Sequence, residues 1–521
     1  MQLLDGSRLL SILTSKYGLA LSSLLLGILN SCGLAPVQMW PLTVIAYVFF
    51  MMIMSICKSK KQVFWLTLIF FASYGTDSLS WLRFVMEGFG EIPVYISTTA
   101  LVLLSIFYIA LPYAILNTIA FKIANGKKAV YLCCFMPLAF ILGDFFTGWF
   151  LTGLPWIYSG YSCVEGPLKN YASIIGVRGI TALIYLLSAV LALTALRRFL
   201  FLPIAALILV IGIFLEGNTQ VTRLSPINVS MVQGNIEQSV RNNGRSVNDI
   251  LGTYWSLSKN RIGTDNLIIW PESALPFSLQ MGQEVVNDID MAFKQGGSSL
   301  VTGIFSTKPN QIYNSIISIG KDTDISTLVP YNKRILVPFG EVLPFAELLR
   351  PLGSIFVIPN SSFNYGDENQ EPIKAAGLLF TPAICYEAIF PELISKLDND
   401  KTNAIMMLSN DSWFGPTKAP VQHLNIARMR SMELQKPMLR DTNSGITTYI
   451  DEHGNLEKTL PTDVADVLSF EFYPVKGQTI YSKFGNTGLY IIMLILLLSG
   501  CYGLFRKDDE VREQLNKLIR P

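Results

Sequence analysis

Eight long apolar stretches constrain the fold of this chain more than any other feature of its sequence. They lie at 17–36, 39–57, 63–82, 94–121, 129–152, 179–196, 199–216 and 489–505. A helix needs ~20 mostly apolar residues to cross the hydrocarbon core of a bilayer. We therefore predict a membrane domain of seven helices at 1–217 and an eighth membrane helix at 488–505. The region between them, 218–487, has the composition of an ordinary globular domain.

Lysine and arginine residues predict the orientation of these helices. Cytoplasmic links retain basic residues, and every second link of this chain is basic. The basic links carry Arg8, Lys16, Lys58, Lys60, Lys61, Lys122, Lys127, Lys128, Arg197 and Arg198. We predict a multi-pass protein with both termini in the cytoplasm, including a tail at 506–521. The region 218–487 would then be exported, which in a bacterium places it at the periplasmic face of the inner membrane. The net charge of +2 argues against a nucleic-acid partner.

Short β-branched runs alternate with helical patterns in the exported region. The strand-like runs are 227–236, 266–272, 300–305, 313–320, 328–333, 375–387, 404–410, 438–450 and 467–472. The helical patterns are 245–260, 282–295, 390–398 and 420–435. This alternation predicts an α/β fold, in which two sheets can pack face to face with helices outside.

Cys385 is the only cysteine of the exported region. Within that region it has no partner for a disulfide and no second sulfur to help hold a metal. It follows the apolar run 382–384 and precedes Tyr386 and Glu387. A buried cysteine is most often a small hydrophobic residue. Its position where an apolar strand turns acidic favours a second interpretation, in which Cys385 is a nucleophile.

A nucleophilic cysteine needs a base, and the chain has only two histidines. His453 lies in a predicted hairpin turn and His423 opens a predicted helix, so neither resembles a partner for the cysteine. Glu272, at the end of a strand-like run, is an alternative base. Moving a proton from a free cysteine to a free glutamate costs about 4 pKa units, or roughly 6 kcal/mol. Burial of the glutamate and a nearby ammonium, for which Lys333 is a candidate, would reduce this cost.

Motifs spread along the chain carry a family resemblance. They are Val232–Ile236, Trp270–Ser273, Lys333–Glu341, Ser409–Gly415, His423–Arg430 and Arg440–Gly445, with Thr152–Trp156 in the membrane domain. In this order they resemble the apolipoprotein N-acyltransferase family of the carbon–nitrogen hydrolase (nitrilase) superfamily. The resemblance covers nearly the whole chain. It implies an αββα nitrilase-like sandwich mounted on an eight-helix transmembrane bundle.

The same resemblance implies roles for individual residues. Glu272 would be the general base, Lys333 the oxyanion stabiliser and Cys385 the nucleophile of a Glu-Lys-Cys triad. Glu341 would orient or neutralise Lys333. Tyr386 and Glu387, which directly follow the nucleophile, also match residues that the family needs. Four residues are candidates for substrate binding: Asn410, Trp413, Phe339 and Trp149. The alternative for Phe339 is an ordinary core residue, and the alternative for Trp149 is an anchor at the membrane interface.

The reaction implied by the resemblance has two halves. The Cys385 thiolate attacks an acyl ester of a phospholipid, typically phosphatidylethanolamine, and a thioester forms. The amine of the N-terminal diacylglyceryl-cysteine of an apolipoprotein then takes the acyl chain, which matures the lipoprotein. The reaction needs no metal or soluble cofactor, and the family expectation is a monomer in the lipid bilayer. The triad alone permits an alternative, a membrane-tethered amidase that uses water as the acceptor.

One position departs from the family pattern. Members commonly carry a tryptophan shortly after the Val232–Ile236 motif, where this chain has Arg241, Asn242 and Asn243. Any substrate contact made by that ring is therefore either absent here or made by another side chain.

Overall fold

The computed structural model describes residues 13–88, 90–196, 199–236, 247–343 and 363–506. Asn242 and residues 507–521 of the predicted tail lie outside these ranges. The chain forms two compact units. The helical unit comprises Met1–Arg83, Val94–Glu216 and Asn486–Pro521, and the sheet unit comprises Phe84–Pro93 and Gly217–Gly485.

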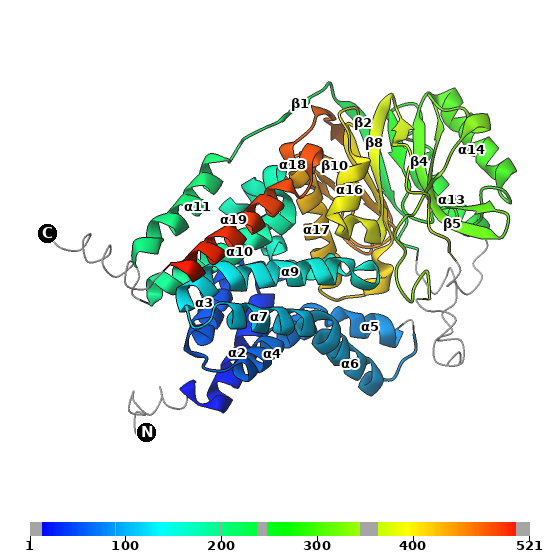
Figure 1. The fold of residues 1–521 in the computed structure, drawn as a ribbon. Helices are drawn as coiled ribbons and strands as arrows, with labels where there is room; N and C mark the ends of the chain where they lie inside the picture. The colour runs from blue at the N-terminus through cyan, green and yellow to red at the C-terminus, as the bar shows by residue number, and fades with distance from the viewer. Residues whose placement is uncertain (1–12, 89, 197–198, 237–246, 344–362, 507–521) are drawn as a thin grey trace, which may run out of the picture. The chain divides into compact units, whose positions relative to one another are not determined.

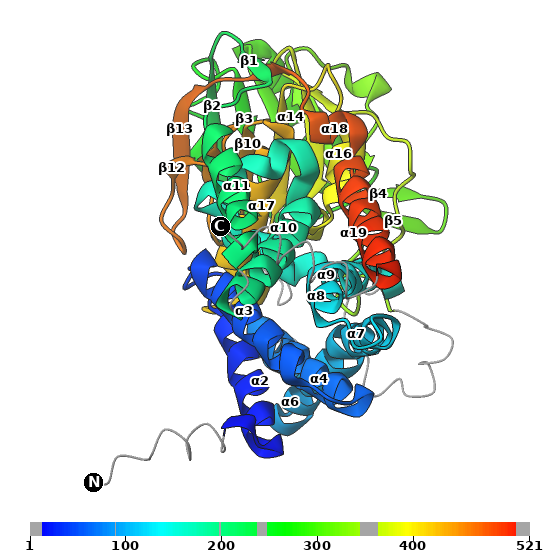
Figure 2. The same ribbon diagram turned by 60° about the vertical axis from the view of Figure 1, so that its left-hand side comes forward.

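Each apolar stretch predicted to cross the membrane contains a helix of the helical unit (Figure 2). The helices are α2 (Lys16–Ser31), α3 (Trp40–Ile56), α4 (Lys60–Ser78), α6 (Val94–Leu103), α7 (Leu111–Ile123), α9 (Met136–Trp149), α10 (Ala172–Ala195), α11 (Leu202–Phe214) and α19 (Thr487–Phe505). A π-helical segment, Leu104–Ala110, joins α6 to α7.

Among the described residues, four helical segments are long and apolar enough to cross a membrane. They are Val94–Ile123, Lys128–Thr152, Pro167–Ala195 and Thr487–Phe505. Helices α3 and α11 are apolar but shorter. The structure thus confirms a helical, membrane-type unit, whereas the number of eight crossings stays a prediction.

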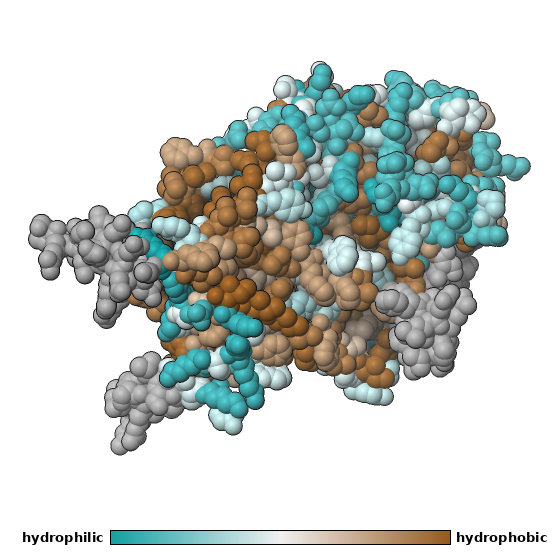
Figure 3. Space-filling view, in the orientation of Figure 1, coloured by the Kyte–Doolittle hydropathy of each residue, from teal (hydrophilic) through white to brown (hydrophobic). Residues whose placement is uncertain are grey.

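The helical unit carries apolar side chains on its surface and encloses a few buried polar side chains that are hydrogen-bonded within it. Apolar side chains gather on the surface of α19 (Figure 3), where Ile491, Leu494 and Leu498 are exposed. Inside, the buried Asp144 carboxylate accepts hydrogen bonds from Tyr113 at 2.6 Å and from Tyr185 at 3.0 Å. These hydrogen bonds satisfy the buried acid and connect α9 with α7 and α10.

The sheet unit contains two six-stranded sheets (Figure 1). The first has the order β13 (Asp466–Phe472), β2 (Ile227–Gln233), β3 (Leu267–Ile269), β4 (Ser299–Lys308), β5 (Gln311–Gly320) and β6 (Tyr331–Asn332). The second has the order β12 (Leu456–Thr459), β11 (Thr448–Ile450), β10 (Met438–Thr442), β9 (Ala404–Ser409), β8 (Leu378–Ile384) and β7 (Ile373–Ala375). All nine predicted strand runs contain a strand, and the predicted α/β fold is confirmed.

Helices flank both sheets, and the sheets contact each other. Helices α13 (Val247–Ser258) and α14 (Gln283–Gly296) pack against the first sheet, while α16 (Pro391–Leu397) and α17 (Ala419–Leu434) pack against the second (Figure 1). Strand β10 packs against β2, and β7 packs against β4 and β5. All four predicted helical patterns contain a helix.

Two predicted runs each proved to be two strands. The run 375–387 holds the end of β7 and all of β8, because Ala376 and Gly377 adopt positive φ angles of 50° and 74° and turn the chain. The run 438–450 likewise divides at the turn that contains Gly445, whose φ is 118°. Such angles favour tight turns over extended strand.

Parallel pairing places the carboxyl ends of key strands at one edge of each sheet. Strands β2, β3 and β4 are parallel neighbours, as are β8, β9 and β10. Side chains that follow parallel strands converge at that edge, which is where α/β proteins commonly place their sites. Glu272 comes shortly after β3, and Cys385 comes directly after β8.

Candidate active site

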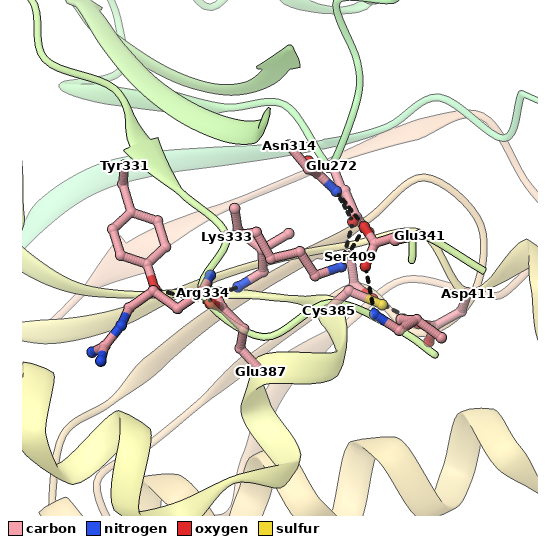
Figure 4. Close-up of polar contacts among 12 residues, drawn as sticks. Glu272, Asn314, Tyr331, Lys333, Arg334, Glu341, Cys385, Glu387, Ser409 and Asp411 are labelled. Atoms are coloured by element: carbon pink, nitrogen blue, oxygen red, sulfur yellow. Dashed lines mark hydrogen bonds and ion pairs between the residues drawn. The ribbon is translucent and has the colours of Figure 1, made fainter. Parts of the chain in front are cut away.

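The sheet unit brings Glu272, Lys333, Glu341 and Cys385 together, as Figure 4 shows. Glu272 and Lys333 are 7% and 1% exposed, so both charged groups are buried. Lys333 follows β6, the edge strand of the first sheet, whereas Cys385 follows β8 of the second sheet. The candidate site is therefore assembled from both sheets.

Lys333 is held between two carboxylates. Its Nζ lies 2.9 Å from Glu341 Oε1 and 3.3 Å from Glu272 Oε1. Asn314 on β5 donates its Nδ2 to the same two oxygens, at 2.8 Å for Glu272 and 3.0 Å for Glu341. Glu341 Oε2 also accepts the backbone N–H of Val337 at 2.8 Å. An ammonium and an amide thus bridge two carboxylates that would otherwise repel each other.

The carboxylates keep Lys333 charged. Burial by itself lowers the pKa of a lysine, but Glu341 and Glu272 outweigh burial and hold the pKa of Lys333 above its usual value. The site therefore contains a permanent ammonium beside Cys385. A fixed positive charge of this kind is suited to stabilising an oxyanion.

Cys385 has an unusual backbone and a raised thiol pKa. Its φ is +48°, in the left-handed region that few non-glycine residues adopt. Burial raises the pKa of the thiol and Glu272 raises it further, while Lys333 acts in the opposite direction. We expected the ammonium to lower this pKa, and its effect has that sign, but desolvation is larger. The raised pKa favours the thiol form, so any attack by this sulfur would require a base to take its proton.

Glu387 connects the segments that carry Cys385 and Lys333. Its carboxylate is fully buried and accepts the backbone N–H of Ile384 at 2.8 Å, the backbone N–H of Arg334 at 2.6 Å and the Tyr331 hydroxyl at 3.1 Å. One side chain thus fixes the backbone next to both Cys385 and Lys333. Burial raises the pKa of Glu387 to about 7 despite these donors.

Activity should therefore fall as the pH drops through about 7. A protonated Glu387 turns one acceptor oxygen into an O–H group and cannot accept all three hydrogen bonds. We expect a pH profile of kcat with a rising limb near 7, and a low, flat profile across that range for Glu387→Gln. A limb that stays at the same pH in the variant would assign it to another group. The free energy of unfolding should change with pH in the opposite direction to activity. Because the pKa of Glu387 in the folded protein exceeds the ordinary value of 4.5, the free energy of unfolding declines as the pH rises from about 4.5 to 7.

The remaining predicted residues occupy different surroundings. Tyr386 packs edge-on against Phe390, with ring centroids 5.3 Å apart. Asn410 accepts hydrogen bonds from Ser412 Oγ at 2.7 Å and Asn443 Nδ2 at 3.2 Å, which anchors the loop after β9. Phe339 is 44% exposed with a φ of +62°, so it is not the buried core residue of the alternative interpretation.

Trp413 and Trp149 differ in exposure and belong to different units. Trp413 is half-buried in the turn Asp411–Phe414 of the sheet unit. Close to this turn, the segment Phe84–Pro93 joins the sheet unit, and a Cβ built on Gly415 would lie 2.1 Å from the Phe84 ring. Trp149 ends α9 of the helical unit and is 76% exposed.

Two parts of the site escaped the sequence reasoning. Asn314 lies in a strand whose sequence is mostly apolar, and a polar residue at an inward position of such a strand was the available signal. His423, set aside as a helix-opening residue, lies with Nε2 only 3.2 Å from the carbonyl oxygen of Cys385. Its signal was the polar character of α17, which is nonetheless almost entirely buried.

Two family models match the chain, one over most of the helical unit and one over most of the sheet unit. The family model of the apolipoprotein N-acyltransferase N-terminal domain matches residues 26–190, and the carbon–nitrogen hydrolase model matches residues 229–478. A solved structure of a carbon–nitrogen hydrolase superfamily protein from Xanthomonas campestris is 15% identical, with a TM-score of 0.35, and covers 52% of this chain and 97% of that chain.

Curated relatives resemble the chain over nearly its full length. The apolipoprotein N-acyltransferase of Shewanella oneidensis is 34% identical over 91% of this chain and 94% of its own. That of Vibrio cholerae is 32% identical over 92% of this chain and 96% of its own. Both units, and the order in which they occur, are included in these matches. The chain therefore belongs to the apolipoprotein N-acyltransferase family.

Proposed function

We propose that this protein transfers a fatty acyl chain from a phospholipid, with phosphatidylethanolamine the expected donor, to the N-terminal diacylglyceryl-cysteine amine of apolipoproteins. The observation that supports the chemistry most is the buried Lys333 ammonium, which bridges Glu272 and Glu341 beside Cys385. The family relationship supports the substrates. The acyl chain passes through a thioester on Cys385.

The first half-reaction begins with a neutral thiol and an ionised glutamate. Cys385 Sγ attacks the ester carbonyl carbon of the phospholipid while Glu272 takes the thiol proton. The proton transfer neutralises the Glu272 carboxylate as the sulfur becomes negative, so the net charge of the site does not change. The C–S bond forms, the ester C–O bond breaks, and the proton on Glu272 passes to the departing lysophospholipid oxygen.

Lys333 stabilises the oxyanion that forms during attack. An ammonium has three N–H donors, and two of them point to Glu341 and Glu272. We assign the third to the carbonyl oxygen of the substrate as it becomes negative. Removing a single oxyanion donor typically costs 10²–10³ in kcat, and a buried cation contributes at least as much because the surrounding dielectric is low.

The second half-reaction transfers the acyl chain to nitrogen. The α-amine of the lipoprotein attacks the thioester carbon, and Glu272 accepts a proton from that amine. The C–S bond breaks, the proton returns to Cys385, and the amide product leaves. Glu272 thus acts as a base toward both nucleophiles.

A membrane platform fits these substrates. Both carry acyl chains in the bilayer, and exposing such a chain to water costs ~0.8 kcal/mol per CH₂. We propose eight membrane crossings, an αββα arrangement of the sheet unit in the periplasm, both termini in the cytoplasm of a bacterium with the protein in its inner membrane, and a monomeric state. The apolar helices of the helical unit support the membrane setting.

A product assay separates acyl transfer from hydrolysis by an amidase. Purified protein is incubated with phosphatidylethanolamine labelled in its acyl chains and with a diacylglyceryl lipopeptide that has a free α-amine. We expect label on the lipopeptide together with a lysophospholipid that keeps the label of its one remaining acyl chain. An N-acetylated lipopeptide is the matched control and should remain unlabelled. Free labelled fatty acid as the only product, at the same rate with and without lipopeptide, would favour hydrolysis and contradict the proposal.

A further inference from the structure

We propose that His423 is a positioning residue for Cys385, acting through a hydrogen bond from its Nε2–H to the Cys385 carbonyl oxygen. The inference rests on the proposed function and adds a residue outside the Glu-Lys-Cys set. It starts from the backbone of Cys385. A left-handed φ of +48° is unfavourable for a non-glycine residue, and such a conformation persists only where neighbouring groups hold it in place.

The geometry determines which nitrogen of His423 carries a proton. Nε2 lies 3.2 Å from the carbonyl oxygen of Cys385. A carbonyl oxygen only accepts hydrogen bonds, so Nε2 must be the donor. The ring is completely buried, and Phe414 packs against it with an interplanar angle of 78°. His423 thus contacts the backbone of Cys385 through its Nε2.

The other nitrogen of the ring is held by a buried ion pair. Nδ1 lies 3.3 Å from Asp411 Oδ1 and 3.3 Å from Arg440 Nη2. Asp411 and Arg440 pair with each other at 2.7 Å, and Ser409 Oγ donates to Asp411 Oδ1 at 2.8 Å. Although burial opposes ionisation, Arg440 and His423 hold the pKa of Asp411 well below its usual range. The Nδ1 atom of the ring therefore lies beside both the Asp411 carboxylate and the Arg440 guanidinium, and the Nε2 atom lies beside the Cys385 carbonyl oxygen.

Three segments fix this ring. Asp411 follows β9, Arg440 lies on β10, and His423 lies near the start of α17. On the other side of the nucleophile, Glu387 accepts the N–H of Ile384. Glu387 therefore restrains the Ala383–Ile384 peptide, one residue before Cys385, and His423 restrains the peptide that follows the Cys385 α-carbon. These restraints hold the backbone on both sides of Cys385, which sets the direction of its Cα–Cβ bond toward the site.

Three substitutions separate this role from general support of the fold. His423→Met fills the space without a donor, and His423→Gln keeps an N–H near the position of Nε2. We expect His423→Met to lower kcat for acyl transfer by 10- to 100-fold, with KM for phosphatidylethanolamine changed less than 2-fold. His423→Gln should retain at least a third of wild-type kcat. If His423→Met is not recovered folded, His423→Asn, whose shorter amide reaches only the Nδ1 position, takes its place.

Alkylation of Cys385 by iodoacetamide gives a second readout that needs no lipid. The alkylation rate is followed on the Cys385 peptide by mass spectrometry. It should fall at least 5-fold in His423→Met, the variant without a donor, and should return toward the wild-type rate in His423→Gln. If wild-type protein transfers no acyl chain, the proposed function fails while this assay still tests the positioning role. Unchanged kcat and alkylation in the donor-free variant, or an equal loss in the glutamine variant, would overturn the inference.

Discussion

Replacing Cys385 with alanine is expected to abolish acyl transfer, with a fall in kcat of at least about 10⁴. Removing the nucleophile of a catalytic triad has effects of this size, because the covalent route is lost entirely. Cys385→Ser should be equally inactive in forming an acyl-enzyme, since a serine hydroxyl is far harder to deprotonate than a thiol. The measurement is the initial rate of lipopeptide acylation in the assay described above.

A matched cysteine substitution controls for effects on folding. Cys133 lies in the helical unit and is half-buried like Cys385, so Cys133→Ala should keep wild-type activity. The thermal midpoint of Cys385→Ala should lie close to that of the wild type, because the substitution removes one sulfur atom and keeps the Cβ. Residual activity of the alanine variant above about 1% of wild type would contradict the assignment of Cys385 as the nucleophile.

Replacing Lys333 with methionine should produce the second-largest effect, lowering kcat by at least about 10³. The variant loses the oxyanion donor and leaves Glu272 and Glu341 facing each other with only Asn314 between them. Because uncompensated buried charge is costly, the free energy of unfolding should also fall by about 3–5 kcal/mol. Denaturant unfolding of the detergent-solubilised protein measures the second effect, and the acylation assay measures the first.

A second substitution distinguishes the two consequences of losing Lys333. Adding Glu341→Gln to Lys333→Met removes one of the opposed carboxylates, so we expect stability to recover in part while activity does not. Lys321→Met, at an exposed position of the same unit, is the control and should change neither quantity. If Lys333→Met kept more than a tenth of wild-type kcat, or if the double variant were less stable than the single one, the bridging role of Lys333 would be wrong.

Much of the fold followed from local sequence patterns. Apolar stretches predicted the helices because lipid-facing and buried helical surfaces are both apolar. Runs of β-branched residues predicted the strands because such side chains pack well on the buried faces of sheets. Strand β12 escaped notice because its sequence, Leu456–Thr459, is fully exposed and has no apolar alternation. The division of the run 438–450 depended on the backbone at Gly445, which composition alone does not reveal.

The site was predictable where chemistry lies at the end of a strand and not where it depends on contacts between distant segments. Glu272 and Cys385 each follow an apolar run, so their positions signalled a site. Asp411, His423 and Arg440 come from three different elements, and only the tertiary structure brings their side chains together. The raised pKa of Cys385 also required the structure, because the balance between burial and the Lys333 charge depends on the degree of desolvation.

The most direct test of the central claim is intact mass spectrometry of the protein after incubation with phosphatidylethanolamine and no acceptor. The account predicts a mass increase of one fatty acyl group, located on the Cys385 peptide and removed by hydroxylamine or by an added diacylglyceryl lipopeptide. An acyl group on any other residue, or acylation of the lipopeptide by protein whose Cys385 never carries one, would contradict it.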